Sequence, residues 1–282
     1  MARKIKTIME NGIDKREVGY YSTPSFVAKY LTHEMLSINP NGASVLDPAV
    51  GREELLEEFY KAGKTIDSYD IIKHCEYRMS NFCQRNFIEV YADFVNNNFF
   101  STEASHYDYM IANPPYNCHE INYIKENKKW LNCLFPVGVY NMYSIFLSAM
   151  ISMAKDGCLI GVVISDSFLT SNYHSKLREQ ILSTCSIHQI ILCPTDLFWS
   201  QHADVRTCIM ILQKGKKYQS NVLISNRPNS ISEFKDILLN HALKDVSIDS
   251  LLLKCNKVSN QILIDVNQEI VGLFHRYPSL GE

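Results

Sequence analysis

The run Tyr107-Asp108-Tyr109-Met110-Ile111-Ala112, followed by Asn113-Pro114-Pro115-Tyr116, is the part of the sequence from which the fold is inferred. The apolar run is typical of a buried strand, and the proline-rich turn ends it. Such a turn can hold a planar amino group, because the Asn113 side-chain oxygen and the Pro114 carbonyl are two acceptors in fixed positions. Two acceptors favour an amine nitrogen that becomes positive as it attacks an electrophile. The alternative is an ordinary proline turn with a capping Asn.

Composition limits what this chain can be. Its 282 residues, 46% of them hydrophobic, allow one large α/β domain or two small ones. The net charge of −2 lacks the basic excess of a self-sufficient DNA binder, so any contact with nucleic acid must be local or depend on other parts. Nine dispersed Cys without a C-x-x-C pair, and His residues without ligand spacing, predict neither a disulfide framework nor a metal site. No apolar run reaches the ~18 residues of a membrane span, and no signal peptide is visible, so we expect a cytoplasmic protein without membrane contact.

Short apolar runs alternate with amphipathic segments between residues 44 and 213. We expect strands over Ser44–Leu46, Lys64–Tyr69, Ile88–Tyr91, Tyr107–Ala112, Cys158–Ser165, Ile187–Leu192 and Thr207–Gln213. We expect helices over Glu53–Ala62, Lys73–Gln84, Asn141–Met153 and Ser175–Leu182. This alternation predicts an α/β fold with a doubly wound, mostly parallel, seven-stranded sheet. In such sheets ligands bind beyond the carboxyl ends of the strands.

The segments outside this region are less regular. A helix should begin near Thr23 and Pro24, with Thr23 as its cap. Residues 218–282 are expected to contain a strand over Asn221–Ser225, a helix over Ile231–His241 and an amphipathic stretch over Asn267–Arg276.

Acidic residues follow three of the expected strands. Asp47 begins the turn Asp47-Pro48-Ala49-Val50-Gly51, where Gly51 lets the backbone approach a ligand closely. The helix that follows offers unpaired N–H groups to a carboxylate, and Asp47 could accept an amino group. Asp70 ends the second expected strand, where an acidic residue can bind two ribose hydroxyls. Each Asp alone could equally be a helix cap or a turn former.

The third expected strand ends at Asp93, which is followed by Phe94. A carboxylate at this place could accept an adenine amino group, while Phe94 and Ile71 cover the two faces of the ring. Three carboxylates at successive strand ends, followed by the Asn-Pro-Pro-Tyr turn, favour a nucleoside-containing cofactor.

Taken together, these motifs resemble the amino-group DNA methyltransferases that modify adenine N6, in the subgroup whose cofactor motifs precede the catalytic tetrapeptide. The resemblance covers roughly residues 17–215. It rests on Gly19-Tyr20-Tyr21-Ser22-Thr23-Pro24, Asp47-Pro48-Ala49-Val50-Gly51, Asp70, Asp93-Phe94, Asn113-Pro114-Pro115-Tyr116, Val139–Tyr143, Ile164–Phe168 and Ala203–Thr207.

The resemblance implies a Rossmann-like methyltransferase fold and S-adenosylmethionine as cofactor, with Tyr21, Thr23 and Ala49 among the residues that contact it. It also implies double-stranded DNA as substrate, within a restriction-modification system of a bacterium, archaeon or phage. Residues 1–217 would form the catalytic domain. Residues 218–282 would then connect it to a target-recognition domain, or to a specificity subunit, that is absent from this chain.

One position departs from the family pattern. The family usually has Asp-Pro-x-x-Gly-x-Gly, and Glu53 stands at the second glycine. A side chain there, and its negative charge, would lie where the backbone should meet the methionine carboxylate. We therefore expect reduced or altered cofactor affinity.

A base inside a duplex must flip out to reach such a site. Tyr116 would stack on one face of the flipped base, and Tyr173 or His174 from the loop after Phe168 on the other; surface helix residues are the plainer interpretation of both. Three further functions stay open: methylation of cytosine N4, methylation of a protein glutamine amide, and a non-catalytic interaction subunit that keeps the fold.

Overall fold

The computed structural model describes residues 21–97, 105–116, 121–201, 205–215, 220–255 and 258–266. Its sheet strands are β1 (Ser44–Asp47), β2 (Thr65–Asp70), β3 (Asn81–Gln84), β4 (Tyr109–Ala112), β5 (Leu159–Ser165), β6 (Cys185–Leu192), β7 (Thr207–Lys214), β8 (Asn221–Ser225) and β9 (Lys244–Ser247). Strands β10 (Leu252–Cys255) and β11 (Val258–Ile262) form a separate hairpin. The helices are α2 (Ser25–Ile38), α3 (Glu57–Lys61), α4 (Phe87–Asn97), α5 (Ile121–Leu134), α6 (Met142–Met153), α7 (Ser175–Thr184), α8 (Ile231–Leu239) and α9 (Ile248–Leu251).

The main sheet has the order β3-β2-β1-β4-β5-β7-β6-β8-β9. The strands β3, β2, β1, β4 and β5 pair in parallel, and so do β6 and β8. Strands β7 and β9 are antiparallel to their neighbours. The expected mostly parallel α/β sheet is therefore confirmed. The expected count of seven strands is wrong, because nine strands make up the sheet in the described residues.

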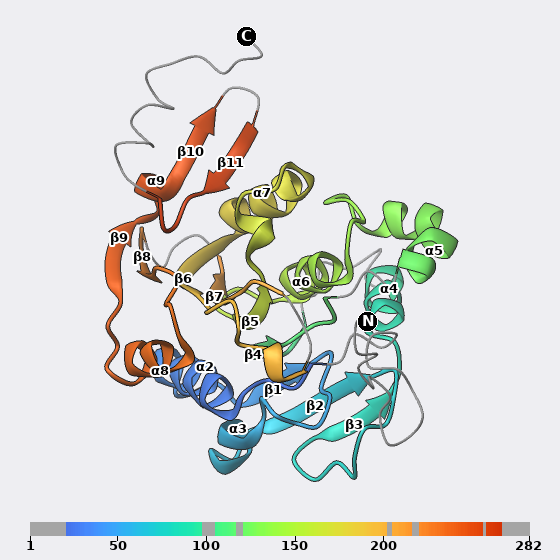
Figure 1. Ribbon diagram of the computed structural model, residues 1–282. Helices are drawn as coiled ribbons and strands as arrows, with labels where there is room; N and C mark the ends of the chain where they lie inside the picture. The colour runs from blue at the N-terminus through green and yellow to red at the C-terminus, as the bar shows by residue number, and fades with distance from the viewer. Residues whose placement is uncertain are drawn as a thin grey trace, which may run out of the picture.

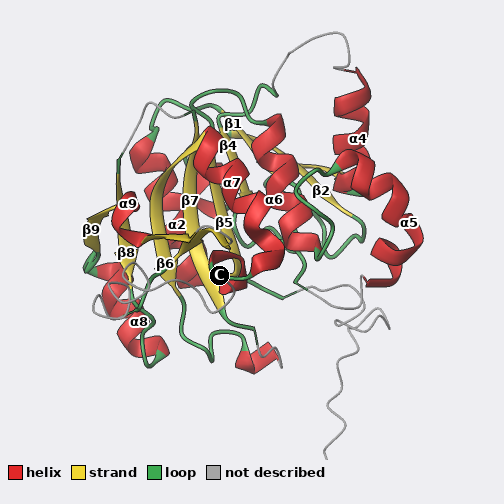
Figure 2. Ribbon diagram, turned by 90° about the horizontal axis from the view of Figure 1, so that it is seen from above, coloured by secondary structure: helices red, strands yellow, loops and turns green. Residues whose placement is uncertain are grey.

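Helices cover both faces of this sheet (Figure 1), as a doubly wound fold requires. On one face α2 packs against α3, α8 and β5, and on the other α6 packs against α4, α7 and β5. Figure 2 shows the strands as a layer between these helices. Nearly every residue of α6 is buried, because this helix is enclosed by the sheet and by two other helices. Strand β4 is buried at all four positions, which explains its continuous apolar run.

Between residues 73 and 97 the structure differs most from the sequence-based prediction. Ile88–Tyr91 belongs to helix α4 and not to a strand, and the third strand, β3, lies in the second half of the expected helix Lys73–Gln84. In α4 the buried residues are Phe87, Ile88, Tyr91 and Ala92, which is the spacing of one helix face. Strand β3 lies at the edge of the sheet and is mostly exposed, so it carries no apolar signal.

Beyond residue 217 the chain continues the same sheet. The predicted strand and helix are found as β8 and α8, and β9 completes the edge. The hairpin of β10 and β11 packs on α7, as Figure 1 also shows. The amphipathic stretch expected over Asn267–Arg276 lies outside the described residues. In the part of the chain that is described, no helix is both long enough and apolar enough to cross a membrane.

Candidate functional site

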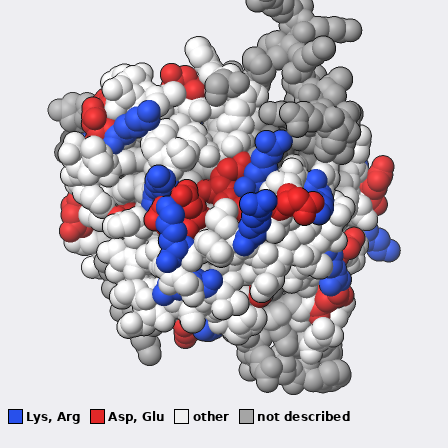
Figure 3. Space-filling model, turned by 90° about the horizontal axis from the view of Figure 1, so that it is seen from below, with Lys and Arg blue, Asp and Glu red and all other residues white. Residues whose placement is uncertain are grey.

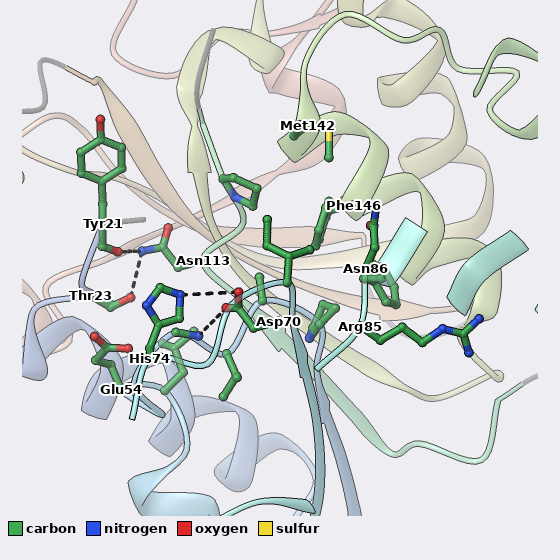
Figure 4. Close-up of a pocket in the computed structure, with 18 of the residues that line it drawn as sticks. Tyr21, Thr23, Glu54, Asp70, His74, Arg85, Asn86, Asn113, Met142 and Phe146 are labelled. Atoms are coloured by element: carbon green, nitrogen blue, oxygen red, sulfur yellow. Dashed lines mark hydrogen bonds and ion pairs between the residues drawn. The ribbon is translucent and has the colours of Figure 1, made fainter. Parts of the chain in front are cut away.

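A cavity of about 250 Å³ lies at the carboxyl edge of the parallel strands, beyond the ends of β1, β2, β3 and β4. Of the residues predicted from sequence, Tyr21, Thr23, Ala49, Gly51, Asp70, Ile71, Asn113 and Pro115 line it. Figure 4 shows the Asn113 amide directed toward Tyr21 and Thr23, with Met142 and Phe146 on the opposite wall. The prediction that the strand ends meet at one site agrees with this arrangement. The predicted Asp47, Pro114, Tyr116, Asp93, Phe94, Tyr173 and His174 do not line this cavity.

The Asn113 side-chain amide is held in one orientation. Its Nδ2 donates to the Tyr21 carbonyl at 2.9 Å and to the Thr23 hydroxyl at 3.0 Å. Thr23 therefore does not cap α2 as expected; Pro24 occupies the N-cap position, without a side-chain cap. Because both amide hydrogens have partners, the Asn113 oxygen is the atom left to accept from another group.

Tyr116 is folded inward in this structure. Its hydroxyl lies 2.5 Å from Asn113 Oδ1 and 2.6 Å from the Val163 carbonyl, and its single proton can be donated to only one of them at a time. The ring is buried and lies 6.2 Å from the ring of Phe198 and 6.3 Å from that of Tyr21, measured between centroids. The ring expected to receive a base is therefore buried in this structure, beside two other aromatic side chains.

Asp47 is almost fully buried behind the glycine turn. Its Oδ1 accepts from the Ala49 N–H at 3.0 Å, and its Oδ2 has no hydrogen-bond partner in the described part of the chain. Burial raises the pKa of Asp47 well above its usual range, and the neighbouring carboxylates of Asp70, Glu54 and Glu53 raise it further. A cationic group that reached this carboxylate would be strongly favoured.

Asp70 closes the glycine turn onto β2. Its Oδ2 accepts from the Gly51 N–H at 3.0 Å and its Oδ1 from the Ile72 N–H at 3.1 Å, while His74 lies 3.5 Å from Oδ1. Gly51 has φ of +55°, a conformation that glycine adopts without steric cost. The Tyr77 hydroxyl donates to the Gly51 carbonyl at 2.9 Å. The glycine turn is thus hydrogen-bonded to Asp70 at the end of β2 and to Tyr77 in the segment that follows β2.

The predicted strand-end pair Asp93 and Phe94 is misplaced. Both residues lie within α4, so neither follows a strand. The Asp93 side chain is about half exposed and pairs with the Arg85 guanidinium at the protein surface, and Phe94 packs against the core. In Figure 4 the Arg85 guanidinium points away from the cavity.

The residues that do follow β3 are Arg85, Asn86 and Phe87, and all three line the cavity. The Asn86 oxygen accepts from the Ile88 N–H at 3.0 Å, and its Nδ2 donates to the Tyr123 hydroxyl at 3.1 Å. The ring of Phe87 lies 5.2 Å from that of Phe146. The helical spacing of apolar residues after Asn86, with Asn86 as a capping residue, is the signal that could have identified them.

Further lining residues were not predicted from sequence. They come from the turn before α3, the segment after β2, and helices α5 and α6: Glu54, His74, Tyr123, Met142 and Phe146.

Glu53 does not face the cavity, contrary to the expectation that its charge would lie beside the cofactor. It has φ of +64° and is buried, and its carboxylate accepts from the Arg78 N–H at 3.1 Å, the Met79 N–H at 3.0 Å and the Ser80 hydroxyl at 2.9 Å. The side chain at the second glycine position therefore fixes the segment between β2 and β3.

His174 and Tyr173 have different surroundings. His174 is buried, and its Nε2 lies 2.9 Å from the Tyr143 hydroxyl, so it offers no free face for stacking. Burial, with the nearby Arg178 charge, lowers the pKa of His174 to about 4, which keeps the ring neutral at pH 7. Tyr173 is 67% exposed, and its ring lies 5.0 Å from that of the exposed Tyr140.

Comparison with known proteins places these features in a family. The chain is 28% identical over 221 residues to the type II methyltransferase M.BanIII of Aneurinibacillus aneurinilyticus, covering 68% of this chain and 38% of that protein. The chain thus spans about two fifths of the length of this relative.

Two solved structures share the fold. One is a protein of Vibrio vulnificus YJ016 assigned as the modification subunit of a type I restriction enzyme, with a TM-score of 0.62 and 15% identity over 89% of this chain and 60% of that one. The other is a protein of Listeria monocytogenes assigned to the class I S-adenosylmethionine-dependent methyltransferases, with a TM-score of 0.58 and 18% identity over 79% of this chain and 71% of that one. The family model described as N-6 DNA Methylase matches residues 9–261, and the chain therefore belongs to the N-6 DNA methylase family.

Proposed function

We propose that this chain is the catalytic part of an S-adenosylmethionine-dependent DNA methyltransferase that modifies adenine N6 within a restriction-modification system. The observation that carries the proposal is the oriented amide of Asn113 at the rim of the strand-end cavity. Its oxygen is available to an incoming amino group once the Tyr116 hydroxyl has moved away. Membership of the N-6 DNA methylase family supports adenine as the target.

The charge of the residues that line the cavity suits the proposed cofactor. Asp70 and Glu54 line it, and the unpartnered oxygen of Asp47 lies behind the glycine turn. S-adenosylmethionine carries a sulfonium and an ammonium group and supplies the methyl group when bound. We propose that Asp70 accepts the ribose hydroxyls. Asp47 is buried and does not line the cavity, so the proposed contact of its carboxylate with the ammonium group requires the glycine turn to shift.

The adenine end of the cofactor is proposed to lie beside Asn86 and Phe87. An amide can accept and donate hydrogen bonds at the edge of a base, and an aromatic ring can cover its face. Tyr21 and Thr23, which hold Asn113, also line this cavity. One short segment therefore contributes both to the proposed cofactor site and to the orientation of the catalytic amide.

At the reacting centre, Asn113 Oδ1 and the Pro114 carbonyl are proposed to accept the two N–H bonds of the target amine. These acceptors favour the positive charge that develops on nitrogen during attack. The amine takes the place that the Tyr116 hydroxyl occupies in this structure, so the Tyr116 ring must turn, and it can then cover one face of the flipped base. Tyr173, the more exposed of the two predicted partners, is the better candidate for a second stacking contact.

DNA and a separate recognition element are the proposed partners. Sequence specificity needs contacts in a groove, beyond those that position the base. We propose that a further segment or a specificity subunit provides them, and that residues 218–282 lead toward it. The geometry of Glu53 removes the reason for preferring a non-catalytic subunit, since its carboxylate is bonded to the segment after β2 and not directed at the cofactor site.

The test is product analysis. Unmethylated DNA is incubated with the chain, alone and with its recognition partner, and with S-adenosylmethionine labelled in the methyl group; the DNA is then digested to nucleosides for mass spectrometry. We expect label in N6-methyladenine. Label in N4-methylcytosine would refute the adenine assignment, and the absence of calorimetric binding of S-adenosylmethionine would support a non-catalytic role. Asn113→Ala should lower the rate by about 10²–10³-fold while the cofactor still binds.

A further inference from the structure

The segment between β6 and β7 contacts the residues that hold Asn113. Its short helical turn Trp199–Gln201 ends at Gln201, whose side-chain amide pairs with the main chain of Ser22. The Ser22 N–H donates to Gln201 Oε1 at 2.6 Å, and Gln201 Nε2 donates to the Ser22 carbonyl at 2.6 Å. Because both bonds come from one planar group, they fix the orientation of the Ser22 main chain as well as its position.

The peptide unit between Tyr21 and Ser22 is held from both sides. Its carbonyl, which is that of Tyr21, accepts from Asn113 Nδ2 at 2.9 Å, as the dashed line in Figure 4 shows. Its N–H, which is that of Ser22, donates to Gln201. In a trans peptide these two groups point to opposite sides of one rigid plane. A rotation of that plane would lengthen both bonds, so Gln201 fixes the direction in which the Tyr21 carbonyl meets the Asn113 amide.

Gln201 also lies behind the second partner of Asn113. The Thr23 hydroxyl accepts from Asn113 Nδ2 at 3.0 Å, and Thr23 directly follows the Ser22 carbonyl to which Gln201 donates. The two acceptors of the Asn113 amide therefore belong to the two neighbours of the residue that Gln201 holds.

The three amides donate in the same direction. The Asn113 amide donates to the Tyr21–Ser22 peptide, and this peptide donates to the Gln201 amide. Hydrogen bonds in such a chain polarise one another, by about 10–30% per bond. Each donation toward Gln201 raises the electron density on the oxygen of the donating amide, so Asn113 Oδ1 becomes a better acceptor. This is the atom proposed to accept the target amine while its nitrogen becomes positive.

Gln201 is itself fixed by its own turn. Its N–H donates to the Phe198 carbonyl at 2.9 Å. The Phe198 ring is buried and lies 6.4 Å from the ring of Tyr21 and 6.2 Å from that of Tyr116, measured between centroids. One turn thus places an aromatic ring beside Tyr21 and an amide on Ser22, so the pairing of Gln201 with Ser22 is part of a packed contact between two segments.

This chain of hydrogen bonds consists of neutral groups. Figure 3 views the molecule from the underside of Figure 1; among the described residues drawn there, Lys and Arg lie beside Asp and Glu and form no continuous basic stripe. Salt weakens interactions between such exposed charges. A contribution from Gln201 should instead be the same at low and high salt, which distinguishes it from that of a basic residue in contact with DNA.

We propose that Gln201 is a positioning residue for methyl transfer: it holds the Tyr21–Ser22 peptide and, through that peptide, orients and polarises the Asn113 amide. The effect on methyl transfer rests on the proposed function, whereas the effect on the Asn113 amide does not.

The first test needs no methylation. The Nδ2 proton signals of Asn113 are recorded by NMR in the full chain with isotope-labelled asparagine, and are assigned by their loss in Asn113→Ala. We expect both protons to exchange slowly with water, because both are hydrogen-bonded. Gln201→Met, which keeps the length of the side chain and removes its two hydrogen bonds, should shift these signals and speed their exchange.

Thr195→Ala is the control for this test, because Thr195 is an exposed residue of the same segment, and it should change neither shift nor exchange. Gln201→Ala should act as Gln201→Met does, and the remaining amide signals of each variant report whether its fold is kept. Unchanged Asn113 signals in the Gln201 variants, or equal changes in Thr195→Ala, would overturn the proposal.

The second test separates positioning from a merely structural role. The value of kcat is measured at saturating S-adenosylmethionine, with the product analysis described above, for Gln201→Met, Asn113→Ala and the double variant. Gln201→Met should lower kcat by up to about 10²-fold, the loss that a small displacement at a reacting centre can cause. In the Asn113→Ala background the same change should leave the residual rate nearly unaltered, because the amide through which Gln201 acts is gone.

Equal losses in the two backgrounds, or an unchanged kcat in Gln201→Met, would overturn the proposal. Altered Asn113 signals in a protein that methylates no DNA would support the role of Gln201 at this amide while refuting the proposed function.

Discussion

Replacing Glu53 tests whether the side chain at the second glycine position stabilises the folded protein. Two effects oppose each other in Glu53→Gly. The left-handed backbone, with φ of +64°, costs a non-glycine residue about 1 kcal/mol, which glycine recovers. The three hydrogen bonds to the carboxylate are lost, and a hydrogen bond to a charged group typically contributes about 1.5–3 kcal/mol.

The donors of these hydrogen bonds belong to a segment that is partly exposed, so water can replace part of each bond. We therefore expect a total loss of about 2–3 kcal/mol from the bonds, and a net destabilisation of about 1–2 kcal/mol in Glu53→Gly. Glu53→Ala loses the same bonds and keeps the backbone cost, so it should be less stable than Glu53→Gly by about 1 kcal/mol.

The assay is urea unfolding, with the free energy of unfolding extrapolated for each variant. Glu76→Ala is the matched control, because Glu76 is an exposed carboxylate in the same segment, and its change should stay within about 0.5 kcal/mol. A Glu53→Gly protein more stable than the wild type would refute this account, since it would mean that the carboxylate contributes less than the left-handed backbone costs. Equal stabilities of the Gly and Ala variants would show that the backbone at this position carries no cost.

Four other positions give separate predictions. Asp70→Ala should weaken S-adenosylmethionine binding by about 1.5–3 kcal/mol in calorimetry, whereas Asp93→Ala should leave it unchanged, because Asp93 lies at the surface of α4; equal losses would contradict the assignment. Because the pKa of Asp47 is raised, the folded protein keeps this proton to a higher pH than the unfolded chain does, and the free energy of unfolding should fall as pH rises above about 4. Asp47→Asn should remove that fall, as measured by unfolding at a series of pH values without cofactor. Since the pKa of His174 falls from 6.5 to about 4 on folding, stability should fall as pH drops through this interval, and His174→Gln should flatten the dependence; an unchanged curve would show that the ring is already accessible to protons.

The strand ends that follow apolar runs could be predicted from the sequence. The apolar runs before Asp47 and Asn113 are buried strands, and a short continuous apolar run that ends in a turn is typical of a strand. Strand β3 could not be found in this way, because an edge strand with exposed side chains has no apolar pattern. Because of that omission, the sequence analysis assigned the adenine contacts to Asp93 and Phe94, which do not line the cavity, whereas Asn86 and Phe87 do.

Hydrogen bonds between distant segments could not be predicted from the sequence either. The carboxylate of Glu53 reaches donors about 25 residues later, and nothing in the local pattern predicts that pairing. The inward position of Tyr116 likewise depends on the Val163 carbonyl of a neighbouring strand. Residue type alone indicated what these side chains can do, and the packing decided which partner each one has.

The way Asn113 is held limits which residue this site can accept. Both acceptors of its amide hydrogens, the Tyr21 carbonyl and the Thr23 hydroxyl, belong to the segment just before α2. A carboxylate of the same shape would place an oxygen against the Tyr21 carbonyl, and two acceptors would then face each other without a proton between them. Aspartate at position 113 would therefore be excluded by the main chain of Tyr21 before any base arrived. The choice of an amide over an acid at position 113 is therefore imposed by a residue that lies 92 positions earlier in the chain.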